Sequence, residues 1–129
     1  MSVSRMASTS PYAYVIGFSS AVRAGSLVFV AGTTAVDSSG AVIGGDDPYA
    51  QTQEALRKIG AVLTEAGTDL SHVVQTRMYL IRPEHWQHVG RAHGEVFADN
   101  PPAATMVIVA GLLDPRMLVE IEAVAHLGL

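Results

Sequence analysis

Residues 117–125 read MLVEIEAVA, and the alternation within this stretch decides how the end of the chain folds. Side chains alternate across a β-strand, so the pattern predicts a strand with one wholly apolar face and a second face that carries both glutamates, about 7 Å apart. Burying a carboxylate is costly unless it is paired or used. The apolar face is made by the odd positions, Met117, Val119, Ile121, Ala123 and Ala125.

A second strand is predicted from VVQTRMYLI, residues 73–81, and it alternates in the same way. Val74, Thr76, Met78 and Leu80 form its mostly apolar face, opposite Gln75, Arg77 and Tyr79. If helices cover both apolar faces, Arg77 shares a face with Glu120 and Glu122. Such a mixed face is typical of a subunit interface with a polar cleft, although ordinary cross-strand ion pairs on a solvated face would give the same pattern.

The remaining segments predict an α+β domain of order βββαβαββ, in which two helices pack on one face of a mixed or antiparallel sheet. One helix spans residues 48–66 and stops at Gly67. The other spans 83–98. Its expected apolar stripe is Trp86, Val89, His93, Val96 and Phe97. Further strands are expected on both sides of Gly25-Ser26, at 41–43 and at 104–110. Residues 1–14, rich in Ser and Thr, predict a flexible lead-in to a single domain over residues 15–129.

Composition narrows the class of protein. The chain has 129 residues, of which 49% are hydrophobic and 16% charged, and such a composition favours burial of some surface against other subunits. Its net charge is −4 and its cations are scattered, which disfavours a nucleic acid as partner. No apolar run is long enough for a membrane span and the start has no long apolar segment, so we expect a cytoplasmic protein. No phosphate loop or nucleotide fingerprint indicates a cofactor.

Five segments, taken in order, resemble the Rid family, which comprises YjgF-like reactive-intermediate or imine deaminases, often labelled L-PSP endoribonucleases. They are AVRAGSLVFVAGT, QTQEALRKIGAVLTEAG, LSHVVQTRMYL, NPPA and LVEIEAVA, and the match covers about residues 17–126. The resemblance implies a chorismate-mutase-like, YjgF-like fold. It also implies a homotrimer with a central barrel, helices outside and three clefts between subunits.

The resemblance also implies a reaction, the hydrolysis of enamine or imine intermediates to 2-keto acids and ammonia. Glu120 matches the family's glutamate that places or activates water, and Gly32 matches a pocket glycine. The carboxylate-clamping arginine is replaced by Ala104. Without this clamp we expect weak or no activity on standard 2-imino acids. The other departures within the implied substrate site are Phe18 for a tyrosine, Gly90 for an asparagine and His93 for a tyrosine.

Two residues keep alternative interpretations. Arg77 would either bind a substrate anion in place of the missing clamp or pair with Glu120 or Glu122. His93 would either pack with the apolar stripe of its helix or line the cleft as a proton-transfer group. His85 and His88 are three residues apart but have no evident third ligand, so no metal site is expected.

Three functions remain open from the sequence. The first is an enzyme that hydrolyses an imine, an enamine or a related small metabolite with Glu120 as its catalytic residue. The second is a non-catalytic trimer that binds a metabolite or a partner protein through the same cleft. The third, an endoribonuclease, is disfavoured by the acidic charge balance and the scattered arginines.

Overall fold

A computed structural model describes residues 2–128, so Met1 and Leu129, which belong to the two predicted segments 1–14 and 15–129, lie outside the described residues. The elements, in chain order, are β1 Val3–Met6, α1 Ala13–Ile16, β2 Ala21–Ala24, β3 Leu27–Thr33, α2 Pro48–Ala66, the 3-10 turn η1 Leu70–His72, β4 Val73–Leu80, the 3-10 turn η2 Pro83–His85, α3 Trp86–Phe97, β5 Ala103–Ile108 and β6 Val119–His126.

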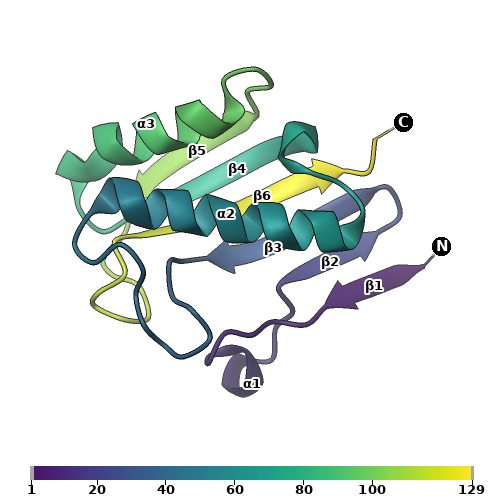
Figure 1. The fold of residues 1–129 in the computed structure, drawn as a ribbon, viewed down its shortest axis with the longest axis horizontal. Coiled ribbons are helices and arrows are strands. Elements are labelled where there is room, and N and C mark those ends of the chain that lie inside the picture. The colour runs from purple at the N-terminus through teal and green to yellow at the C-terminus, as the bar shows by residue number, and fades with distance from the viewer. Residues whose placement is uncertain (1, 129) are drawn as a thin grey trace.

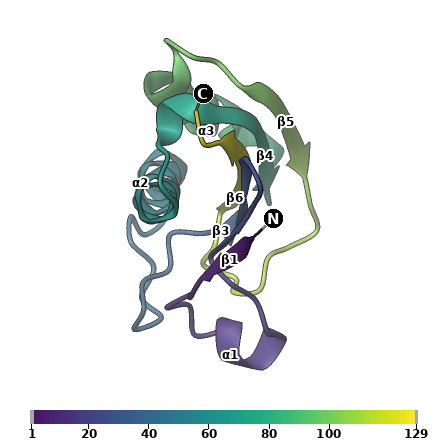
Figure 2. The ribbon, with the colours of Figure 1, turned by 90° about the vertical axis from the view of Figure 1, so that its right-hand side faces the viewer.

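The strands form one mixed sheet in the order β1-β2-β3-β6-β4-β5. Neighbouring strands are antiparallel except β4 and β5, which pair in parallel and are connected through α3. Both α2 and α3 lie on the same side of this sheet, and the short α1 lies apart from them beyond the sheet's end (Figures 1 and 2). The predicted α+β class, with two helices on one face of a mixed sheet, is confirmed.

Local signals set the bounds of α2 as the sequence predicts. The Asp47 side chain accepts the N–H of Tyr49 at 3.0 Å and caps the first turn, where Pro48 fits without losing a hydrogen bond. Gly67 ends the helix in the left-handed conformation, with φ of 96°. With 19 residues α2 is long, yet within residues 2–128 no helix is both long and apolar enough to cross a membrane.

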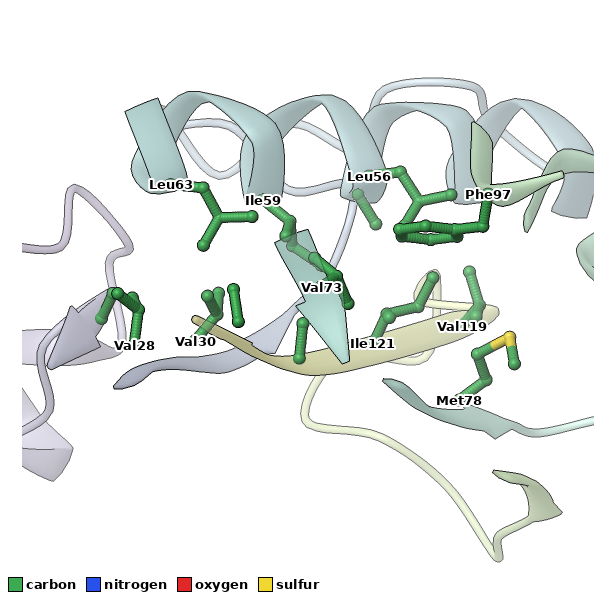
Figure 3. Close-up of a cluster of buried hydrophobic side chains, with 14 of the residues drawn as sticks. Val28, Val30, Leu56, Ile59, Leu63, Val73, Met78, Phe97, Val119 and Ile121 are labelled. Carbon is green, nitrogen blue, oxygen red and sulfur yellow. The ribbon is translucent and has the colours of Figure 1, made fainter. Parts of the chain in front are cut away.

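The core lies between the two helices and the sheet (Figure 3). Burial alternates without interruption along β6, so the predicted apolar face lies under the helices and both glutamates point to the other side. The side chains labelled in the figure show this contact. Leu56, Ile59 and Leu63 of α2 reach down toward Val30, Val119 and Ile121.

Two predictions for the N-terminal half are wrong. Residues 3–6 are not part of a flexible lead-in, because β1 pairs along its whole length with β2, in a register that sets Val3 opposite Ala24. Residues 41–43 form no third strand. Val42 makes one isolated bridge to Val36. The turn between them is closed by Asp37, whose carboxylate accepts the N–H groups of Ser39 and Ala41. With β1 in place of residues 41–43, the predicted order βββαβαββ holds apart from the short α1, which lies between β1 and β2.

The apolar faces predicted for α3 and β4 also differ from the faces that are buried in the structure. On α3, Trp86 and Val96 are 57% and 39% exposed, whereas Ala92 is buried on the same face as Val89 and Phe97. On β4, Val74 is 45% exposed while Val73 is buried. A β-bulge between residues 73 and 75 breaks the alternation at that point, which sequence parity cannot foresee.

Candidate functional site

Glu120 lies near the start of β6, beside Tyr79 of β4, on the sheet face that the helices leave uncovered. Its side chain is half-buried. Burial, followed by the nearby charge of Glu122, raises the pKa of the Glu120 carboxyl above its usual range. Within the described residues no hydrogen bond contributes to this shift, and Glu120 lines a cavity.

Space for that carboxylate comes from Gly32. The pairing of β3 with β6 shifts register between Val30 and Thr33, so Gly32 lies in a bulge. A Cβ at residue 32 would lie 2.7 Å from Glu120 Oε2 and 2.9 Å from its Cδ. Only glycine leaves room for the glutamate at this approach, so the two residues are matched to each other.

A cavity of about 180 Å³ opens at this contact. The sequence-based prediction placed Phe18, Gly32 and Glu120 in one site, and all three line this cavity. Its other lining residues are Ser10, Tyr12, Ala31, Thr34, Leu113 and Met117. Within residues 2–128, neither a lysine nor an arginine lines it. The cavity lining therefore mixes apolar side chains with a few hydroxyl groups and one carboxylate, and it suits a small uncharged or cationic ligand.

The sequence analysis missed Ser10 and Tyr12, because residues 1–14 were interpreted as flexible. A usable signal was present in SPY, since serine and proline favour turns. The Ser10 hydroxyl accepts the N–H of Tyr12 at 3.2 Å, and the Ser10 N–H bonds to the Ser8 hydroxyl at 3.0 Å. This turn carries Tyr12 to the cavity.

Arg77 shares the open face of the sheet with Glu120, as parity predicts, but it lines a separate hollow of about 240 Å³. Its Nη1 lies 3.5 Å from Glu122 Oε1, and Tyr79 donates its hydroxyl to the same carboxylate. That hydrogen bond, with burial and the charge of Glu122, raises the pKa of Tyr79. Within one chain Arg77 thus pairs with Glu122 and not with Glu120, and among the described residues no lysine or arginine lines the cavity of Glu120.

The histidines at the start of α3 do not gather into a metal site. His85 lies in the 3-10 turn, with its Nδ1 buried and without a hydrogen-bond partner in the described part of the chain, and His88 follows on α3. Among residues 2–128, no three His, Asp or Glu side chains are grouped so that they could hold a metal ion.

With this geometry in place, comparison with known proteins is informative. The family model described as Endoribonuclease L-PSP matches residues 8–127. The chain belongs to this family, also called the YjgF, RutC or Rid family.

Similar proteins within the family share most of their length with this chain. The uncharacterized protein SCO2049 of Streptomyces coelicolor is 39% identical over 126 residues, covering 98% of this chain and 93% of the relative. The RutC family protein PYRAB12510 of Pyrococcus abyssi is 33% identical, covering 84% and 85%. The crystal structure of Rv2704 from Mycobacterium tuberculosis, described as a member of the YjgF/YER057c/UK114 family, has a TM-score of 0.87 and 42% identity, covering 97% and 99%.

The other positions matched to the Rid family lie on the opposite side of the sheet. Ala104 of β5 is the register partner of Thr76, which is buried, whereas Ala104 itself is exposed at the edge of the sheet. Thr76 Oγ1 and His93 Nε2 share a hydrogen bond of 2.9 Å, and the His93 ring lies 4.6 Å from that of Phe97. Burial lowers the pKa of His93, which favours its neutral form. Within one chain His93 is therefore packed and hydrogen-bonded, whereas the alternative role, as a proton-transfer group, concerns a cleft between copies.

Gly90 lies on α3, and a Cβ added at this residue would meet no atom of residues 2–128 within 4 Å, so nothing in the described chain requires glycine there. Gly90, His93 and Ala104 thus group around α3 and β5, away from the cavity of Glu120. A single chain does not bring the two groups of predicted site residues together.

Proposed function

We propose that this chain forms homotrimers whose interface clefts hydrolyse a small imine, enamine or related metabolite, with Glu120 as the catalytic residue. The observation that carries the proposal is the Glu120 carboxylate, half-buried and unpaired within residues 2–128, facing a cavity that the Gly32 bulge opens. A carboxyl group whose pKa is raised takes up and releases protons closer to neutrality than an exposed one.

The proposed reaction uses water as the nucleophile. Glu120 removes a proton from water as the water oxygen bonds to the imine carbon, and it passes this proton to the nitrogen, so the carboxylate is restored. The resulting carbinolamine then collapses. Its hydroxyl proton passes to the carboxylate, the carbon–oxygen double bond forms, and the carbon–nitrogen bond breaks as Glu120 returns a proton to the leaving ammonia or amine.

The substrate is expected to lack a carboxylate beside the reacting carbon. A 2-imino acid would bring its carboxylate toward Glu120 in a cavity whose described lining holds no lysine or arginine, because residue 104 is alanine and Arg77 is paired with Glu122. Removing one partner of a desolvated ion pair costs about 2–5 kcal/mol in binding. Weak or no turnover of standard 2-imino acids follows.

The trimer has support in the distribution of the site residues and of apolar surface. Phe29 and Val124 are register partners on the uncovered face of the sheet, and Phe29 is 46% exposed. Burying this face against other copies would satisfy its apolar side chains. It would also allow the group around α3 and β5 of one copy to approach the Glu120 cavity of another. Sedimentation equilibrium should give three copies, and Phe29→Asp should shift the protein toward the monomer.

Activity can be tested with imines generated in the assay by an oxidase, one series from amino acids and one from simple amines. Release of ammonia should be accelerated for the imines that lack a carboxylate. Glu120→Gln should abolish the acceleration while the trimer persists. Acceleration of 2-imino acid hydrolysis as strong as for the uncharged series would contradict the substrate assignment.

A non-catalytic binding trimer is the alternative, and the lack of a lysine or arginine in the described cavity lining favours it over a conventional 2-imino acid deaminase. Glu120→Ala distinguishes the two. If the cleft only binds a metabolite, this variant changes affinity and there is no turnover to lose.

Ribonuclease activity, which the family description names, has little electrostatic support. Arg57 pairs with Glu54, Arg77 with Glu122 and Arg116 with Asp114, so three of the scattered cations are already engaged. Phosphate-backbone binding needs clustered cations that displace counterions. Failure to bind RNA even at low salt is the expected result.

A further inference from the structure

Lys58 is the single lysine of the sequence, and apart from the histidines every other cationic side chain is an arginine. It lies on α2 and is half-buried. Its Nζ donates to the carbonyl oxygens of Thr34 and Val36, each at 2.7 Å. These two bonds hold the amine against the segment that follows β3.

The two contacts leave the amine chemically available. An ammonium group has three N–H bonds, whereas a neutral amine has two N–H bonds and a lone pair. Two carbonyl acceptors match the two N–H bonds of the neutral form, so Lys58 can lose a proton without losing either hydrogen bond. Burial favours this loss, because it lowers the pKa of Lys58 below its usual range.

A cavity of about 290 Å³ lies against this amine. Lys58, Thr34 and Val36 all line it, together with the hydroxyl-bearing residues Ser8, Thr9, Ser10 and Ser20. Asp37, Arg57 and Glu65 are the other charged residues of its lining. The cavity adjoins that of Glu120, because Tyr12, Phe18 and Gly32 line both.

We propose that Lys58 is a carbonyl-reactive amine that forms a Schiff base with small aldehydes or ketones entering this cavity. The amine lone pair attacks the carbonyl carbon, and the π electrons move to the oxygen. That oxygen takes up both amine hydrogens and leaves as water, and a carbon–nitrogen double bond forms to Nζ. A protonated Schiff base keeps one N–H for one of the two carbonyl acceptors. The inference goes beyond the proposed imine hydrolysis, although that reaction would release carbonyl compounds in the adjoining cavity.

Acetaldehyde with cyanoborohydride tests the proposal on the full chain, since reduction traps the Schiff base as a stable ethyl group. Intact mass and peptide mapping separate Lys58 from the amino terminus. At pH 7 the native protein should be labelled at Lys58 faster than the same chain in denaturant, because a lowered pKa raises the fraction of the neutral, nucleophilic amine. Labelling of Lys58 that is no faster in the native protein overturns the proposal.

Lys58→Arg is the matched variant, since a guanidinium can donate to the same carbonyls but forms no Schiff base under these conditions. It should be labelled only at the amino terminus. The comparison of native and denatured wild-type chain needs no variant, so it stands even if Lys58→Arg fails to fold. Labelling of Lys58 should persist in Glu120→Gln. Lys58 labelling without any imine hydrolysis would defeat the proposed function alone, and hydrolysis without labelling would defeat this inference alone.

Discussion

Gly32→Ala tests the matched pair of Gly32 and Glu120 most directly. The added methyl carbon would lie 2.7 Å from Glu120 Oε2, whereas an ordinary contact begins at 3.4 Å. The carboxylate must therefore move by about 0.7 Å or more, the difference between these distances. Misplacement of a catalytic group by about 1 Å can reduce turnover by about 100-fold, and we expect a loss of that order.

The same substitution should leave the fold largely intact. The obstructed atoms belong to the far end of a flexible side chain beside a cavity, so Glu120 can rotate toward solvent. We expect a loss of less than about 1 kcal/mol in the free energy of unfolding, below the usual cost of overpacking a core. NMR titration should show the pKa of Glu120 falling back toward its ordinary value as the group becomes more solvated.

Gly94→Ala provides the control. Gly94 lies on α3, and a Cβ there would meet no atom of the described chain within 4 Å, so alanine should stabilise the helix by up to about 1 kcal/mol and leave Glu120 of its own chain in place. Denaturant unfolding and ammonia release would be measured on both variants. Full turnover in Gly32→Ala, or a loss of stability above about 3 kcal/mol, would refute the reasoning.

Three further predictions concern stability. Glu120→Gln should raise the melting temperature at neutral and higher pH, and the gain should vanish at low pH. The raised pKa of Glu120 means that its stabilising protonated form is present below the unfolded pKa and is lost as pH rises through the folded value. Asp47→Ala should lower the free energy of unfolding, measured with denaturant, by about 1 kcal/mol. The reason is that the backbone N–H of Tyr49, in the first turn of α2, loses its acceptor. Ile59→Ala should lower the free energy of unfolding by about 2–5 kcal/mol in the same measurement, since this side chain of α2 is fully buried.

Much of the fold could be predicted because its signals are local. Pro48 and Gly67 mark the ends of α2 in the sequence, since capping and chain termination depend on neighbours a few positions away, and the structure shows that Asp47 is the cap. The alternation of apolar and polar residues correctly placed Ile121 and Glu120 on opposite faces of β6. The segments that failed have weak local signals. Residues 3–6 form a strand only because β2 offers a free edge, and Val74 points outward only because the pairing with β6 contains a bulge.

The candidate site, like the fold, has features that the sequence predicts and features that only the folded chain shows. Alternation in the amino-acid sequence was enough to put Glu120 and Arg77 on the uncovered face of the sheet, because parity along a strand is a property of the backbone. The pairing of Arg77 with Glu122, and the approach of Glu120 to Gly32 across a bulge, emerged only in the folded chain. Register between strands distant in sequence is set by how their side chains pack, and packing involves the whole chain at once.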